Sequence, residues 1–246
     1  MDIRHLSSRA YLAFLVLVLA FFAGCHDSGA IRGNGPGSGL MFLQKVDKKN
    51  LPPLSEQEKQ DLAFMRQEEK LARDVYMELS KKWTLPRLNN IVDSEQRHMD
   101  ALKRLLELYD LPDPITKDTP GVFPSDHFST LYKKLTSQGS RSIVDALKVG
   151  ATIEDLDIKD LEECIKRTRN TLLIRVYENL MRGSRNHLRY FISELKARNA
   201  TYEPQYISKQ EFEEIISTPF ERGKGGNCPG GGMGKGPGKG RRTPFL

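Results

Sequence analysis

Four segments of this 246-residue chain carry apolar residues at the spacing of one helical face, and polar residues interrupt each stripe near its middle. Residues alternately three and four positions apart lie on the same face of an α-helix. In one segment, Glu95 and His98 stand between Ile91 and Leu102, where leucines are expected. Any fold of this chain must therefore bring polar groups into its interior. The polar positions on the four stripes are Glu69, then Glu95 and His98, then Glu154 and Asp157, and finally Ser184 and His187.

Carboxylates buried on several helices need compensation, because one unpaired buried charge costs several kcal/mol. A pair of divalent metal ions compensates them, and carboxylates with imidazoles suit iron, manganese or zinc. An acid and a histidine three residues apart, such as Glu95 and His98, reach one ion from adjacent turns. Taken alone, each such histidine is more often a hydrogen-bonded core residue than a ligand. Glu68 beside Glu69 also leaves the register of the first stripe open.

Capping residues and prolines set the expected helix ends. Ser55 with Glu58 forms a capping box, and the prolines at 52 and 53 prevent an earlier start. The expected helices cover 55–83, 88–109, 125–137, 140–166, 171–198 and 209–217, and no strand is expected. These lengths predict an all-α fold, a four-helix bundle with a long crossover between its second and third long helices. The short helix at 125–137 lies within that crossover.

The two ends of the chain differ in composition from the middle. Residues 1–24 have a basic start and a short apolar run, which is typical of a secretory signal peptide. Phe22-Ala23-Gly24-Cys25 resembles a bacterial lipobox, so Cys25 is the expected lipidation site, with cleavage near Ala23 or an uncleaved anchor as alternatives. Residues 25–50 are expected to be a flexible linker, 51–221 the helical domain, and 222–246 a disordered Gly/Lys-rich tail.

The charge distribution argues against a nucleic-acid-binding domain, and the cysteine spacing contains no paired framework. The net charge of +6 matches the six basic residues of the tail, which contains no acid, so the domain is nearly neutral. A nearly neutral domain offers no nucleic-acid-binding face. Cys164 falls on a helical stripe and is expected to be a core thiol, while a Cys164–Cys228 disulfide is the alternative outside the cytoplasm.

Several strings of this sequence resemble ferritin-like proteins. Glu69-x-x-Ala72-x-x-x-Tyr76 is similar to the first metal-binding helix of rubrerythrins, and Glu95-x-x-His98 matches their second-helix motif. EEKLARDVYMEL, NIVDSEQRHMDALKRLL, DALKVGATIEDLDIKDL and VYENLMRGSRNHLRYF resemble a bacterial and archaeal ferritin-like family catalogued only as a domain of unknown function. The resemblance covers about 54–222 and implies a ferritin-like bundle without a proven activity.

The resemblance has one gap. A full di-iron site carries Glu-x-x-His on its fourth helix, and this chain has Ser184 and His187 at those positions. Asp157, one turn after Glu154 on the inward stripe, is the expected replacement for the missing carboxylate. The expected metal ligands are Glu69, Glu95, His98, Glu154, Asp157 and His187.

These features predict a di-metal protein that holds two iron ions per chain, or manganese. The leading hypothesis is a ferroxidase or a peroxide- or oxygen-reducing oxidoreductase with an external electron donor. It is expected to be an exported lipoprotein, anchored to a membrane surface through Cys25 and facing the periplasm or cell exterior. Fold analogy adds a homodimer as a possible state. The alternatives are a non-catalytic metal-binding lipoprotein and a metal-free structural helical bundle.

Overall fold

The computed structural model describes residues 40–222, and this part of the chain is helical and contains no strand. The all-α prediction is therefore confirmed for these residues. The predicted signal peptide, Cys25 and nearly all of the predicted tail lie outside them. The helices are η3 (Met41–Lys45), η4 (Lys48–Asn50), α2 (Glu56–Lys82), α3 (Leu88–Leu108), α4 (Asp126–Gly139), α5 (Ile143–Arg167), α6 (Thr171–Lys196) and α7 (Lys209–Ser217).

The helix ends lie close to their predicted positions because the capping residues act as expected. Ser55 and Glu58 form the reciprocal capping box at the start of α2. Asn170 caps α6 by accepting from the backbone N–H groups of Leu172 and Leu173. Each cap satisfies N–H groups that have no partner inside the helix, so the cap residue fixes where the helix begins.

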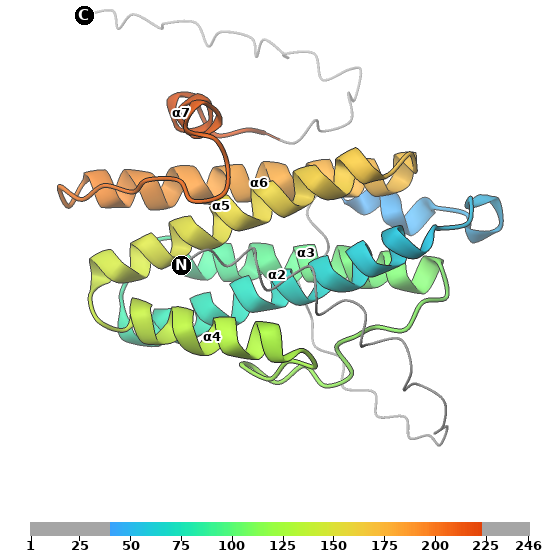
Figure 1. The fold of residues 1–246 in the computed structure, drawn as a ribbon, viewed down its shortest axis with the longest axis horizontal. Coiled ribbons are helices and arrows are strands. Elements are labelled where there is room, and N and C mark those ends of the chain that lie inside the picture. The colour runs from blue at the N-terminus through green and yellow to red at the C-terminus, as the bar shows by residue number, and fades with distance from the viewer. Residues whose placement is uncertain (1–39, 223–246) are drawn as a thin grey trace, which may run out of the picture. The chain divides into compact units, whose positions relative to one another are not determined.

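The long helices pack in two pairs, α2 beside α3 and α5 beside α6, and the pairs meet through α2 with α5 and α3 with α6 (Figure 1). Each pair is joined by a short connection, whereas residues 109–142 connect the pairs and contain α4. α4 packs on α2 and α5. In the described part of the chain, no helix is long and apolar enough to cross a membrane.

Residues 40–50, the last part of the predicted linker, pack against the helices. Leu40 and Leu43 are buried and belong to the same apolar core as leucines of α2, α3 and α6. The guanidinium of Arg175 on α6 lies 3.7 Å from the centre of the Phe42 ring, a cation–π contact. The remainder of that linker, residues 25–39, lies outside the described residues.

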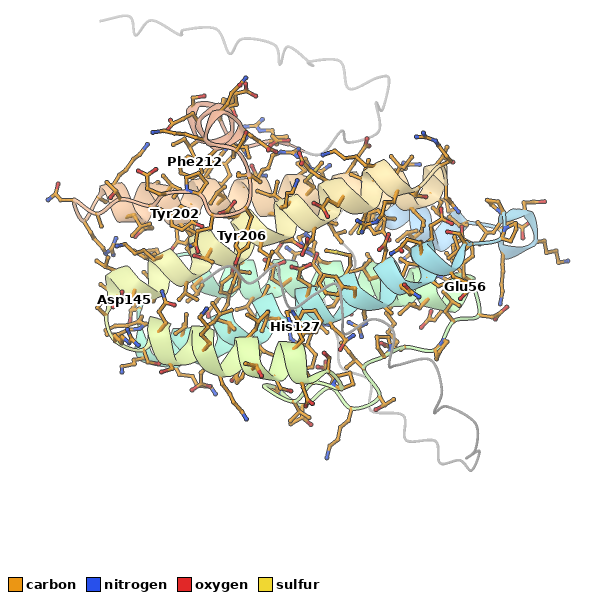
Figure 2. All side chains as sticks on the ribbon, in the orientation of Figure 1. Glu56, His127, Asp145, Tyr202, Tyr206 and Phe212 are labelled. Carbon is orange, nitrogen blue, oxygen red and sulfur yellow. The ribbon has the colours of Figure 1, made fainter. Side chains whose placement is uncertain are left out.

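The segment after α6 is held to α5 by a buried carboxylate. Asp155 accepts hydrogen bonds from the Tyr202 hydroxyl at 2.7 Å and from the backbone N–H groups of Gln205 at 2.5 Å and Ile207 at 2.9 Å. Tyr202 also contacts Phe212 of α7, with ring centres 6.0 Å apart (Figure 2). These contacts fix the C-terminal segment to the outer side of α5.

An ion cluster, here called the loop cluster, joins α2 to the connection at residues 109–142 and consists of the buried Lys70, Arg73 and Asp74 with the exposed Asp118. Lys70 and Asp74 are completely buried and pair one turn apart. Arg73 donates to Asp74 and, at 2.5 Å, to Asp118. Lys70 also donates to the backbone carbonyl of Thr119 at 2.9 Å. The connection between the helix pairs is therefore attached to α2 by charged hydrogen bonds.

Candidate metal centre

Five of the six predicted ligands converge in the interior between the two helix pairs. α2 supplies Glu69, α3 supplies Glu95 and His98, α5 supplies Glu154, and α6 supplies His187. All five side chains are buried, although none is apolar. Their ligand atoms form two groups in which all atoms lie within 4.8 Å of one another: Glu69, Glu95 and His98, and Glu95, Glu154 and His187. The helical stripes therefore meet at the same depth.

Glu95 belongs to both groups and divides its two oxygens between them. Its Oε2 lies 2.8 Å from Nδ1 of His98, and its Oε1 lies 2.8 Å from Nδ1 of His187. The two imidazole rings face each other with centres 5.9 Å apart. A carboxylate with an oxygen directed into each of two adjacent groups has the arrangement of a bridge between two ions.

Each group is completed by one further carboxylate. Glu69 Oε2 lies 3.2 Å from His98 Nδ1, within hydrogen-bond geometry. On the other side, Glu154 Oε2 lies 3.5 Å from His187 Nδ1, and the Tyr76 hydroxyl donates to Glu154 Oε1 at 2.5 Å. Tyr76 thus leaves one oxygen of Glu154 facing the centre and holds the other.

Several buried side-chain atoms of this centre have no hydrogen-bond partner. Glu69 Oε1, Glu95 Oε1 and His187 Nδ1 are buried atoms without a hydrogen-bond partner. The 2.8 Å approach of His187 Nδ1 to Glu95 Oε1 is therefore a close contact without hydrogen-bond geometry. Such orphaned buried atoms are rare in proteins. Carboxylate oxygens and imidazole nitrogens that converge in a buried space are the ligand types that suit iron, manganese or zinc, so these residues fit a pair of divalent metal ions.

The pKa directions show how the acids and imidazoles affect one another. Burial and the neighbouring Glu95 raise the pKa of Glu69 well above its ordinary value. Burial alone would also raise the pKa of Glu95, but His187 and His98 outweigh it and lower that pKa. Burial lowers the pKa of His187, whereas Glu95 and Glu154 outweigh this effect and raise it well above the ordinary value. Positive charge is therefore favoured at this centre.

Asp157, the sixth predicted ligand, is buried beside the centre but belongs to neither group. Its Oδ2 accepts a hydrogen bond from the Ser184 hydroxyl, which also donates to the backbone carbonyl of Leu180 at 3.1 Å. Its Oδ1 is buried without a partner. Burial and the charge of Glu69 raise the pKa of Asp157 well above its ordinary value. Asp157 and Ser184 together thus stand near the position where a fourth-helix glutamate was expected.

Gly183 is a supporting residue that the stripes did not reveal. A Cβ at this position would lie 2.6 Å from Cε1 and 2.7 Å from Nε2 of the His98 ring. Real Cβ atoms do not approach that closely, so the missing side chain makes room for the imidazole. A glycine in the middle of a helix costs about 1 kcal/mol relative to alanine and often marks such a close approach. A glycine in the middle of a predicted helix is the sequence feature that could have indicated this position.

His127 and Tyr177 do not take part in the centre. His127 lies on α4 (Figure 2), which contributes no ligand. It is half-buried, and its ring centre lies 5.1 Å from that of Phe128. Tyr177 is buried in the apolar core, where its hydroxyl has no hydrogen-bond partner. Cys164 is a buried free thiol in the same core, which matches its predicted role.

The fold and this site define a class: all-helical proteins whose interior contains two overlapping acid–imidazole groups. Residues 58–219 match the family model described as "Uncharacterized protein domain (DUF2202)", and the chain belongs to that family. It is 59% identical over 184 residues to the uncharacterized protein MJ0754 of Methanocaldococcus jannaschii, covering 75% of this chain and 98% of the relative. The crystal structure of hypothetical protein MJ0754 from Methanococcus jannaschii is similar, with a TM-score of 0.68, 58% identity, and coverage of 69% of this chain and 97% of that chain.

Proposed function

We propose that this protein is a ferritin-like four-helix bundle that binds two metal ions and uses them in oxidation–reduction outside the cytoplasm. The observation that supports this most strongly is the division of Glu95 between the two groups, with Oε1 and Oε2 each 2.8 Å from a different histidine. Bundles of this class place their metal sites between facing helices, with inward-pointing glutamates and Glu-x-x-His motifs. Here α2, α3, α5 and α6 form the bundle, and residues 109–142 are its long crossover.

The ligand types favour iron, with manganese second. Oxygen ligands from carboxylates and nitrogen ligands from imidazoles suit both ions, and the described part of the centre contains no thiolate to favour a softer metal. We further propose that Asp157 is the sixth ligand, because its Oδ1 is buried and unpaired while Ser184 holds its other oxygen. Glu69, Glu95, Glu154 and Asp157 then balance the charge of two divalent ions.

Two bound iron ions would supply a ferrous–ferric couple able to reduce peroxide or dioxygen. The residues of the chain hold that couple away from bulk water, because every proposed ligand is at most 8% exposed. Tyr76 orients Glu154 through its 2.5 Å hydrogen bond, and Gly183 leaves space for the His98 ring. An external electron donor completes repeated turnover, while a single oxidation of ferrous iron requires none.

Metal counting on single variants tests the shared role of Glu95. The wild-type chain, loaded anaerobically with ferrous iron, is expected to hold about two ions. Glu95→Gln is expected to lose both ions, whereas His98→Ala and His187→Ala are each expected to weaken the binding of one ion. His127→Ala is the matched control, because this histidine lies on α4 outside the centre, and it is expected to keep both ions. No bound metal in the wild-type chain would contradict the proposal and leave the metal-free bundle.

Stopped-flow oxidation separates an enzyme from a binding protein. Peroxide added to the ferrous-loaded chain is expected to oxidise the bound iron, with the change followed by absorbance. Loaded protein whose iron peroxide does not oxidise would instead identify a non-catalytic metal-binding protein. Asp157→Ala tests the sixth ligand in the same assay, because unchanged stoichiometry and unchanged oxidation would remove it from the ligand set.

We also propose that the protein is an exported lipoprotein attached to a membrane surface through Cys25. The lipobox-like sequence Phe22-Ala23-Gly24-Cys25 supports this. Mass spectrometry of the mature N-terminus is expected to show a lipid-modified cysteine, and Cys25→Ser is expected to release the protein from membranes. An unmodified Cys25 in the membrane fraction would contradict lipidation. Sedimentation of the purified chain tests the proposed homodimer.

A further inference from the structure

The C-terminal segment, residues 202–221, contacts α5 and α6 next to two of the proposed ligands. On α5, Glu154 belongs to the centre and the next residue, Asp155, contacts this segment. On α6, His187 belongs to the centre and the residue before it, Asn186, contacts this segment. Consecutive residues of a helix point about 100° apart, so one turn can present one side chain to the centre and another to a covering segment. The turns that carry these two ligands therefore have a polar attachment on another side.

The attachment to α5 is one carboxylate that accepts four hydrogen bonds from the C-terminal segment. Asp155 is fully buried. Its Oδ2 accepts from the Tyr202 hydroxyl at 2.7 Å and from the backbone N–H of Gln205 at 2.5 Å. The N–H groups of Tyr206 and Ile207 donate to the same carboxylate at 3.2 Å and 2.9 Å. Hydrogen bonds to an ionised acceptor are stronger than neutral ones, so this contact fixes the segment on α5.

The attachment to α6 is centred on Glu221. Asn186 donates to the backbone carbonyl of Glu221 at 3.0 Å and accepts from its N–H at 2.8 Å. Arg185 donates to both carboxylate oxygens of Glu221, at 2.8 Å and 2.6 Å, and Arg189 pairs with the same carboxylate at 3.0 Å. The C-terminal segment is therefore attached to α6 within two residues on either side of His187.

The group with Glu69 and His98 has a different attachment. Arg73 of the loop cluster donates at 2.5 Å to the side chain of Gln96, which follows Glu95 on α3. This contact joins α2 and α3, the two helices that carry Glu69 and His98. The two groups of the centre are thus attached to different parts of the chain, the first to the loop cluster and the second to the C-terminal segment.

We propose that the C-terminal segment positions Glu154 and His187 for one metal ion, so that docking of this segment and binding of that ion are coupled. This inference rests on the proposed function, because it assumes that these two residues and Glu95 hold an ion. Ligands on two helices lose less freedom on binding when both helices are already held in place. A segment fixed to α5 at Asp155 and to α6 at Asn186 supplies that restraint. These two side chains are positioning residues, because they act through their neighbours.

Hydrogen exchange measures the coupling from the side of the segment. Coupling acts in both directions, so if docking strengthens ion binding about tenfold, the ion strengthens docking about tenfold. The amide N–H groups of Gln205, Ile207 and Glu221 report docking directly, because each donates to Asp155 or Asn186. Addition of Mn²⁺ to the metal-free full chain is expected to slow exchange at these three amides about tenfold.

Equilibrium dialysis of the full chain against Mn²⁺ measures the coupling from the side of the ion. Glu221→Ala removes the carboxylate that Arg185 binds, and it is expected to weaken one of the two bound ions about tenfold. Asn186→Ala, which removes the contacts to the backbone, is the second variant for the same loss. Glu213→Ala, the same substitution at an exposed position of α7, is the matched control and is expected to keep both affinities.

Histidine variants identify the weakened ion. In His98→Ala the remaining ion lies in the group with His187, and adding Glu221→Ala is expected to weaken it about tenfold. In His187→Ala the remaining ion lies in the group with His98, and adding Glu221→Ala is expected to change its affinity by less than about twofold, as for independent sites. A merely structural role of the segment would lower the stability of the metal-free chain and leave both affinities unchanged.

The outcomes separate this inference from the proposed function. A tenfold loss confined to the group with His187, together with slower amide exchange in the metal-bound wild type, supports the coupling. Equal affinities in wild type and Glu221→Ala, equal weakening of both ions, or amide exchange that Mn²⁺ does not slow overturns the coupling and leaves the metal centre in place. A wild-type chain that binds no Mn²⁺ contradicts the proposed function and overturns this inference with it.

Discussion

The candidate metal centre and the loop cluster both involve residues of α2, and both bury several charged groups. In the loop cluster, Lys70 and Arg73 pair with Asp74 and Asp118, so the chain supplies its own cations. The centre combines carboxylates with two imidazoles, and Glu95 Oε1 and His187 Nδ1 lie 2.8 Å apart without hydrogen-bond geometry. The difference separates buried charges that pair with basic side chains from the carboxylates and imidazoles that we propose bind metal ions.

Removal of the cation from the loop cluster is expected to have the largest effect on stability. Lys70→Met leaves the buried Asp74 with only Arg73 as its charged partner, and breaking a buried pair from one side costs about 3 kcal/mol. Urea unfolding is expected to show this loss with and without metal. Lys81→Met, which removes an exposed lysine paired with Glu78 on the same helix, is expected to change stability by less than about 1 kcal/mol. Equal effects would contradict the assignment of the cluster as structural.

Metal addition is expected to have the next largest effect on stability. We expect this effect to require binding at the candidate metal centre. An ion that binds the folded chain stabilises it by about 2.7 kcal/mol at one hundred times its Kd. Melting of the metal-free chain with increasing Mn²⁺ is expected to show this rise. The rise is expected to disappear in Glu95→Gln and to persist in Lys70→Met measured against its own lower baseline. A metal response that Glu95→Gln retains would place the stabilising ion elsewhere.

Loss of the Tyr76 hydroxyl is expected to have a moderate effect. Tyr76→Phe removes the 2.5 Å hydrogen bond to Glu154 and is expected to destabilise the protein by about 1.5 kcal/mol, because it leaves a buried carboxyl oxygen without its donor. Tyr177→Phe is the matched control: its buried hydroxyl has no partner, so the substitution is expected to be neutral or slightly stabilising. Denaturant unfolding compares the two, and a larger loss from Tyr177→Phe would contradict the hydrogen-bond assignment.

The smallest expected effect is the pH response of the loop cluster. The hydrogen bond from Arg73 lowers the pKa of Asp118 from 3.8 to about 2. A lowered pKa means that this pair stabilises the protein above about pH 4 and that the contribution is lost as pH falls toward 2. Asp118 is 44% exposed, so solvent screening limits the contribution to less than about 1 kcal/mol. Unfolding of wild type and Asp118→Asn is compared between pH 6 and pH 2, and the two stabilities are expected to converge as the pH approaches 2.

The helices and most of the centre follow from the sequence because both depend on local periodicity. Ser55 fixes the start of α2 through its reciprocal hydrogen bonds with Glu58, three positions away. Spacing along each helix likewise reports which side chain faces inward, so Glu69, Glu95, His98, Glu154 and His187 were all predicted as inward-facing positions. Four separate stripes with polar residues at mid-length required those residues to meet.

Contacts between residues far apart in the sequence could not be predicted from local periodicity. The pairing of Arg73 with Asp118 joins a helix to an irregular loop 45 positions away, and no periodicity relates them. The space that Gly183 leaves for His98 depends on how closely α3 and α6 approach. The register of Glu68 was ambiguous because a helix buried on more than one side offers no single inward face, and both Glu68 and Glu69 are buried.

The hydrogen bonds between Asp155 and residues 202–207 determine how far toward the C-terminus a stable fragment of this protein must extend. A chain truncated at the end of α6 would leave this fully buried carboxylate without the hydroxyl and amide donors that satisfy it. Glu221 extends the unit further, since it pairs with Arg185 at 2.6 Å and Arg189 at 3.0 Å. Limited proteolysis is therefore expected to leave a fragment that includes residue 221. The shortest fragment that keeps all of these contacts ends there, some 25 residues beyond the end of α6.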